Sequence, residues 1–126
     1  MEQKYVFDLH AENIEWLNNA GFFKDQQTIL TNRLQEVASK NTAKAIQVQV
    51  EHFQNKLMLQ RNQLDYLVHN IKQQENEVQA TINANPTASD HRKMDDHVKL
   101  RDEVMTFEKL FRDLRTEMME FFAKTL

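Results

Sequence analysis

A heptad seam through the middle of the chain constrains its fold more than any other feature. Over residues 46–81, apolar side chains recur alternately every four and three positions. This seam consists of Ile46, Val50, Phe53, Leu57, Gln60, Leu64, Leu67, Ile71, Gln74, Val78 and Thr81. The spacing places these residues on one face of an α-helix, which must bury that stripe against other helices. The chain contains one Gly and one Pro in 126 residues, so little in it can interrupt long helices.

The same alternation occurs on both sides of the central seam. Before it, the seam positions are Leu9, Asn13, Trp16, Ala20, Phe23, Gln27, Leu30, Leu34 and Val37. After it, they are His97, Leu100, Val104, Phe107, Phe111, Leu114, Met118 and Phe121. The pattern therefore predicts three long helices within a single domain that spans residues 1–126.

The expected helices cover about residues 9–40, 43–83 and 88–124. Asp8 is a suitable N-cap for the first helix, because its carboxylate can accept hydrogen bonds from the free amides of the first turn. Pro86 disfavours helical geometry at Asn85 and predicts the second break. Connections this short make consecutive helices antiparallel. The predicted fold is all-α: an elongated antiparallel three-helix bundle resembling a coiled coil, which dimerisation could complete.

Gly21 leaves two interpretations of the first helix. The run from Asn18 to Gly21 could end a helix, with Asp25 opening another. However, Ala20 and Phe23 stay in phase with the seam across Gly21, whereas a break normally resets the phase. One helix that continues to about residue 40, with or without a kink, is the favoured interpretation.

A polar layer is predicted near one end of the bundle. The chain reverses direction at each short connection, so residues that are equally far from a connection along the chain lie at about the same height in the bundle. By this count, His97 lies level with Gln74 and close to His10. Polar residues that face each other in a core must bond each other or water, and one such layer can fix the register of the helices. The competing hypothesis is a ligand or metal site made of His97, His10 and the nearby Glu75.

Surplus apolar side chains at mid-height predict an interface. They lie off the seams, on both sides of the stripe of each helix that a three-helix core can bury. These residues are Phe22, Met58, Leu59, Met105, Leu110 and Met119. A second copy of the chain or another helical protein would cover them. The alternative is a monomer with an unusually broad core.

Charge and composition argue against several classes of function. The net charge of −3 is spread evenly and no segment has a basic surplus, so neither nucleic acid nor an anionic membrane is an expected partner. No apolar run is long enough to span a bilayer and no signal peptide precedes the first helix, so a cytoplasmic location is expected. There is no Cys.

No motif in the sequence indicates catalysis. Phosphate-binding loops and nucleophile elbows need several glycines, and the five His lack the spacing that grips a metal ion from one helix face. We therefore expect no catalytic residues, no metal ligands and no cofactor. The predicted function is that of a non-enzymatic interaction protein that self-associates or binds a helical protein. The alternative is a bundle that binds a metal or small ligand at the polar layer around Gln74 and His97.

Overall fold

Three long helices make up the structure, a computed structural model that describes the backbone of residues 2–84 and 91–126 and the side chains of 6–84 and 95–126. They are α1 (Glu2–Lys40), α2 (Lys44–Ala84) and α3 (His91–Thr125). The described residues contain no strand. The predicted all-α three-helix bundle is confirmed, and α2, with 41 residues, extends over about 60 Å.

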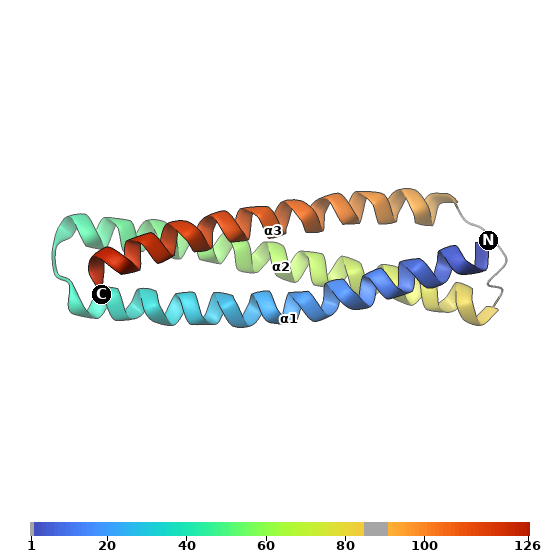
Figure 1. Cartoon of the computed structure of the whole chain (residues 1–126), viewed down its shortest axis with the longest axis horizontal. Coiled ribbons are helices and arrows are strands. Elements are labelled where there is room, and N and C mark those ends of the chain that lie inside the picture. Colours follow the sequence, from blue (N-terminus) through green and yellow to red (C-terminus); the bar gives the residue numbers. More distant parts are fainter. Residues whose placement is uncertain (1, 85–90) are drawn as a thin grey trace.

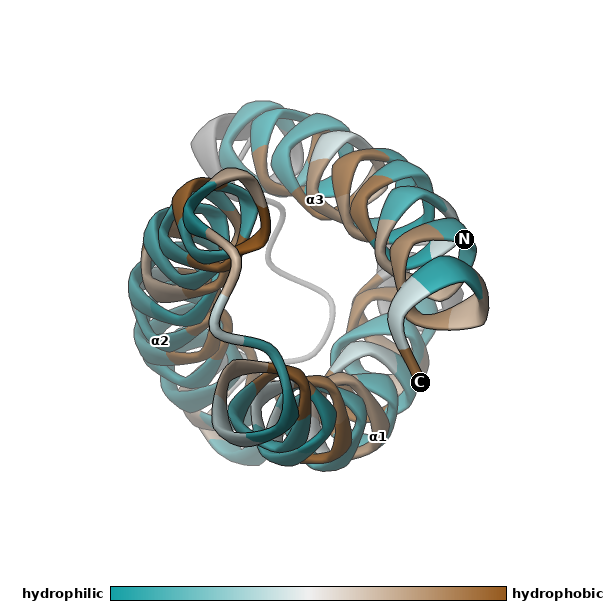
Figure 2. Cartoon of the chain, turned by 90° about the vertical axis from the view of Figure 1, so that its left-hand side faces the viewer, coloured by the Kyte–Doolittle hydropathy of each residue, from teal (hydrophilic) through white to brown (hydrophobic). Residues whose placement is uncertain are grey.

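The helices lie side by side along their whole length (Figure 1). α2 runs antiparallel to α1, and α3 returns in the direction of α1, so the N-terminus and the C-terminus lie at opposite ends of the bundle. A view along the bundle shows hydrophobic residues turned inward on each helix and hydrophilic residues turned outward (Figure 2). The core lies between the three helices and is built mainly of their apolar side chains.

The predicted seams form that core. All eight seam residues of α3 are buried, as are those of α1 except the half-buried Phe23. On α2 the seam is buried except for the half-buried Ile46, Gln60 and Thr81. Aromatic rings fill the middle, where Phe23 lies edge-on to Phe107 and Phe111 with centroids 5.5 and 5.3 Å apart.

The predicted start of the first helix is wrong. α1 begins at Glu2, and Asp8 is an exposed residue inside the helix instead of its N-cap. The reason is tertiary packing, because the seam continues one step upstream to Val6, which is 5% exposed and clusters with Leu9 and Val78. Burial of this extra residue extends the helix beyond the local capping signal.

Gly21 does not interrupt α1. The helix is continuous from Glu2 to Lys40, and Gly21 has no positive φ. A Cβ atom added at Gly21 would meet nothing within 4 Å. The phase of the seam across Gly21 therefore predicted the helix correctly, and no turn here requires glycine.

Asn41 organises the connection between α1 and α2. Its backbone N–H and its side-chain amide both donate to the carbonyl oxygen of Val37, at 3.1 and 3.0 Å. The same amide donates to the carbonyl oxygen of Thr125 at the end of α3, at 3.3 Å. One side chain thus satisfies carbonyl groups of two helix ends. The second predicted connection, around Pro86, and the predicted start of α3 at residue 88 lie outside the described residues.

Polar residues divide the core into two apolar clusters. The larger cluster ends at Trp16, Ile71 and Leu100, and the smaller contains Val6, Leu9 and Val78. Four buried polar residues occupy the interval, namely Asn13, Gln74, Glu75 and His97. The polar layer predicted near one end of the bundle is thus a layer between two parts of its core.

Gln27 is a second polar residue in the core. It is 2% exposed, and within the described structure neither atom of its side-chain amide has a hydrogen-bond partner. The same holds for the Oε1 atom of Gln60. Bonded pairs between α1 and α2, such as Asn13 with Glu75, show that Gln27 and Gln60 lie at about the same height. An unpaired buried amide costs stability and also disfavours other registers.

Gly21→Ala should raise the free energy of unfolding by about 0.5–1 kcal/mol. The position is helical and open, so the methyl group costs nothing in the folded state while the unfolded chain loses freedom. Urea denaturation followed by circular dichroism measures the change. Ala11→Gly, at an exposed position of the same helix, is the matched control and should lower stability by a similar amount. A loss of stability in Gly21→Ala would show that Gly21 serves a bend.

Gln27→Leu should also stabilise the bundle, by about 1–2 kcal/mol, because it replaces a buried unpaired amide with an apolar side chain of similar size. The same denaturation experiment tests it. Gln74→Leu is the control, since it places the same change where the amide is hydrogen-bonded, and it should destabilise. A destabilised Gln27→Leu would instead mean that this amide is bonded in solution.

Candidate functional site

A chain of hydrogen bonds links all three helices at the polar layer. His97 of α3, 1% exposed, lies between Gln74 of α2 and Glu12 of α1. Its Nδ1 atom is 2.6 Å from Oε1 of Gln74, and its Nε2 atom is hydrogen-bonded to Glu12. Arg101 of α3 holds the Glu12 carboxylate in turn, with Nη2 donating to Oε1 at 2.6 Å. The ring of His97 stacks on Trp16, with centroids 4.8 Å apart.

A second group of hydrogen bonds centres on Glu75 of α2. Its Oε1 atom accepts from the amide of Asn13 at 3.2 Å, and its Oε2 atom accepts from the amide of Gln79 at 3.0 Å. Nδ1 of His10 lies 2.5 Å from the same Oε2. His10 therefore belongs to this group and makes no direct bond to His97, so the three predicted layer residues divide between two adjacent networks.

The electrostatics of the layer follow from burial and from Arg101. Burial lowers the pKa of His97, because the imidazolium would lose its hydration, and this outweighs the opposing effect of Glu12. Burial alone would raise the pKa of Glu12, but its hydrogen bonds to Arg101 and His97 and the positive charge of Arg101 lower it overall. A neutral His97 donates from Nε2 to Glu12, and the amide of Gln74, rotated by 180°, can donate to Nδ1.

The layer has little capacity to bind a metal ion. A histidine ligand needs a free lone pair, and both ring nitrogens of His97 already have partners in the protein. Among the residues that the structure describes, no group of three or more His, Asp or Glu side chains is arranged to hold a metal. The arrangement is instead suited to fixing the register of α1, α2 and α3 against one another.

At mid-height of the core, the described residues enclose a hollow that is too small for a ligand. The hollow beside Phe23, Leu67 and Phe107 has a volume of about 20 Å³. That is room for about one water molecule. The surplus apolar side chains therefore do not line an internal pocket there.

All six predicted interface residues are exposed, to between 48% and 65%. They do not share one face. Leu59 and Leu110 line a hollow between α2 and α3, whereas Met105 and Met119 lie elsewhere on α3. Phe22 lies on α1 beside Phe23, with ring centroids 5.9 Å apart, and Met58 lies on α2 outside the lining of that hollow.

Met105 and Met119 belong to an exposed stripe on α3. Val98, Met105 and Met119 of α3, and Leu126 directly after its last residue, are all at least 45% exposed. They are separated by 7, 14 and 7 residues. Residues at multiples of seven lie on one face of a helix in a coiled coil, and Arg112 occupies the missing position at its centre. We call these five residues the outer stripe of α3.

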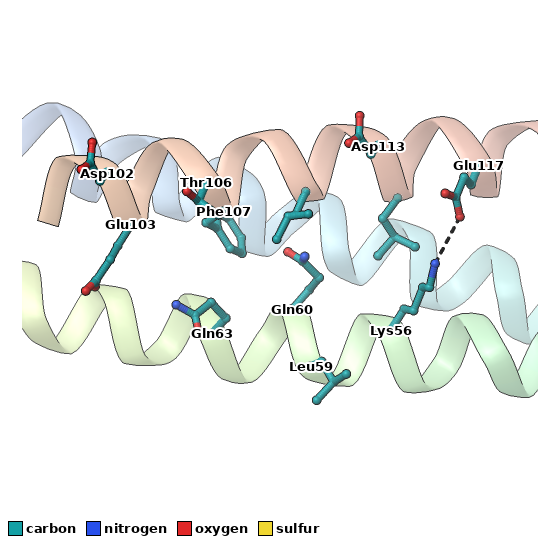
Figure 3. Close-up of a pocket in the computed structure, with 12 residues that line it drawn as sticks. Lys56, Leu59, Gln60, Gln63, Asp102, Glu103, Thr106, Phe107, Asp113 and Glu117 are labelled. Carbon is teal, nitrogen blue, oxygen red and sulfur yellow. Dashed lines mark hydrogen bonds and ion pairs between the residues drawn. The ribbon is translucent and has the colours of Figure 1, made fainter. Parts of the chain in front are cut away.

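The hollow between α2 and α3 is a groove with a volume of about 730 Å³ (Figure 3). Phe107 and Leu114 of α3 and Gln60 of α2 belong to the buried or half-buried part of its lining, and Leu59 and Leu110 to the exposed part. Gln60 extends from α2 towards α3 (Figure 3). We call this hollow the α2–α3 groove.

Carboxylates predominate among the charged residues of the α2–α3 groove. They are Asp102, Glu103, Asp113 and Glu117, against the single cation Lys56. Glu103 and Glu117 point towards α2, and Lys56 reaches across the groove to Glu117 (Figure 3). This ion pair, 3.4 Å long, is largely exposed and therefore weak.

Sequence patterns missed the residues that complete these features. Glu12 and Arg101 lie beside the seams, in positions that read as solvated surface until the tertiary fold brings α1 and α3 together. The groove depends on the separation of two helices, which no local pattern encodes. The outer stripe could have been found, because Val98 and Leu126 continue the seven-residue spacing of Met105 and Met119.

The fold places this chain in the broad class of all-α three-helix bundles. No family model, curated protein or solved structure matches it. None of the described helices has a segment long and apolar enough to cross a membrane.

The stability of the protein should fall as the pH drops below about 6.5. The pKa of His97 is lower in the folded than in the unfolded chain, so the unfolded chain takes up a proton first and acid favours unfolding. Glu12, with its lowered pKa, adds a further loss below about pH 4.5. Urea denaturation at several pH values measures both effects.

His97→Phe keeps a ring beside Trp16 and should abolish the decline that begins near pH 6.5. His52→Gln, at an exposed position of α2, should keep it. An unchanged decline in His97→Phe would show that another group is responsible.

Proposed function

We propose that this protein is a non-enzymatic helical-bundle interaction protein that self-associates and binds helical partners. The outer stripe of α3 carries this proposal. Apolar side chains that recur at seven-residue intervals on an exposed helix face can pack against a second helix, and aligned exposed apolar residues are a common mark of an interaction surface. We also propose that the protein acts in the cytoplasm.

The spacing of the outer stripe supports an antiparallel dimer. Arg112 lies midway between Met105 and Met119 and also midway between Val98 and Leu126. Two copies of α3 related by a twofold axis at Arg112 would therefore match each Met105 with Met119 of the other copy. Such a contact is closed and self-complementary, as most homodimer contacts are.

Arg112 lies at the centre of this contact and destabilises the dimer, because the two like charges would face each other near the axis. Glu108 lies four residues earlier on the same helix and can balance the charge of Arg112. The methionines on either side adapt readily to the packing of a partner surface.

Sedimentation equilibrium at micromolar concentration should give twice the chain mass of 15.0 kDa. Met105→Glu should weaken the dimer at least about tenfold, because the twofold axis repeats the buried carboxylate in both copies. Met58→Glu is the matched control: the same substitution at an equally exposed methionine outside the stripe should leave the mass unchanged. A monomer at all concentrations would contradict the self-association.

Cysteine cross-linking tests the register, since the chain has no Cys of its own. Arg112→Cys should form a disulfide between two copies on air oxidation, because the axis brings position 112 close to itself. Met105→Cys mixed with Met119→Cys should give a mixed disulfide, and neither alone should cross-link efficiently. A dimer without these cross-links would place the interface on another face.

A further inference from the structure

The α2–α3 groove has the size of a site for a helix. Along α3 its lining extends from Asp102 to Glu117, which corresponds to about 22 Å, or about four helical turns. On the α2 side it is lined by residues between Lys56 and Gln63. A helix laid in such a groove would become the fourth helix of the bundle, packed against α2 and α3.

The exposed apolar side chains of the groove suit the apolar face of such a helix. Leu59 and Leu110 are 65% and 51% exposed, and the buried Phe107 and Leu114 line the same groove. Together they offer both an apolar floor and apolar side chains that can close over an occupant.

The charges of the groove favour a helix with basic residues on both sides of its apolar face. Glu103 and Glu117 point into the groove, Asp102 and Asp113 lie on its outer rim, and Lys56 is its cation. A smaller polar hollow continues the groove along the same two helices. That second hollow adds the carboxylates of Glu77 and Asp96 against Lys99. A helix with Lys or Arg on both sides of its apolar face would complement this surface.

Along the α2–α3 groove, the charged residues that α3 contributes are acidic. Its acids Glu103, Asp113 and Glu117 line the groove. No arginine lines it, and Arg101 is turned towards Glu12 of α1. The side of α3 towards α2 is thus mainly acidic, with Lys99 as its cation in the second hollow.

A second copy of this chain fits the groove poorly. In a twofold contact between two grooves, the same four carboxylates would oppose themselves, which is unfavourable. Contact between the groove and a different face of another copy would not close and would generate filaments. The charge pattern therefore favours a different protein.

We propose that the α2–α3 groove binds a basic amphipathic α-helix of another protein. This inference rests on the proposed function, which includes the binding of helical partners. It names the binding site on this chain and the positive charge of the partner. The ion pair between Lys56 and Glu117 spans one end of the groove, so a basic helix must displace Lys56 to reach Glu117.

Fluorescence anisotropy with two labelled peptides tests the charge preference on the full chain. Both peptides are helix-forming and about 16 residues long, with Leu at the first and fourth heptad positions. One carries Lys at the flanking positions and the other carries Glu there. The Lys peptide should bind at least about tenfold more tightly, and the difference should shrink as salt is added.

Charge reversals locate the site. Glu103→Lys combined with Glu117→Lys should reverse the preference between the peptides. Asp65→Lys combined with Glu120→Lys is the matched control, because it changes the net charge equally at exposed positions outside the groove and should keep the preference. Lys56→Gln should tighten binding of the Lys peptide, because it frees Glu117. Thermal melts verify that each variant is folded.

Equal affinity for the two peptides, no binding of either, or an equal effect of the control pair would overturn the inference. If Leu110→Asp weakens self-association and neither peptide binds, the groove takes a second copy and the inference is likewise wrong. A dimer that responds to Met105→Glu while the groove binds neither peptide would leave the self-association intact and remove the groove site alone.

Discussion

The hydrogen-bonded layer around His97 is the constraint on which the rest of the structure depends. A seam of apolar residues that repeats every seven positions tolerates sliding by a whole heptad, because apolar contacts have no direction. The bonds from His97 to Gln74 and Glu12 join one residue of each helix and can form in one register alone. That register sets which residues reach the outer surface and where α2 and α3 form a groove.

The residues that stabilise this bundle differ from those that we propose for binding. The inner seams and the polar layer hold three helices together, while the outer stripe of α3 and the α2–α3 groove present apolar surface that the fold does not use. The two surfaces differ in charge: the stripe has Arg112 at its centre, whereas the groove is bordered by four carboxylates. They suit different partners: a second copy of the chain for the outer stripe, and a basic helix for the α2–α3 groove.

Most of the fold could be predicted because long helices with regular seams are local structures. The residues from Leu9 to Val37 and from His97 to Phe121 show their buried face directly in the spacing. The start of α1 could not be predicted, because the burial of Val6 against Val78 is a contact between distant residues. The polar layer could be predicted in part, since Gln74 and His97 lie on seams, but their partners Glu12 and Glu75 lie beside them.

The sequence by itself determined the helical class, the buried face of each helix and the surplus of exposed apolar residues, because each depends on spacing along a single helix. Only the tertiary structure decided that Leu59 and Leu110 of that surplus line a groove between α2 and α3. It also decided that Arg101 neutralises Glu12 and that the carboxylates of α3 line the groove. The physical reason is that these features depend on the rotation and separation of neighbouring helices, which side chains from all three helices set together.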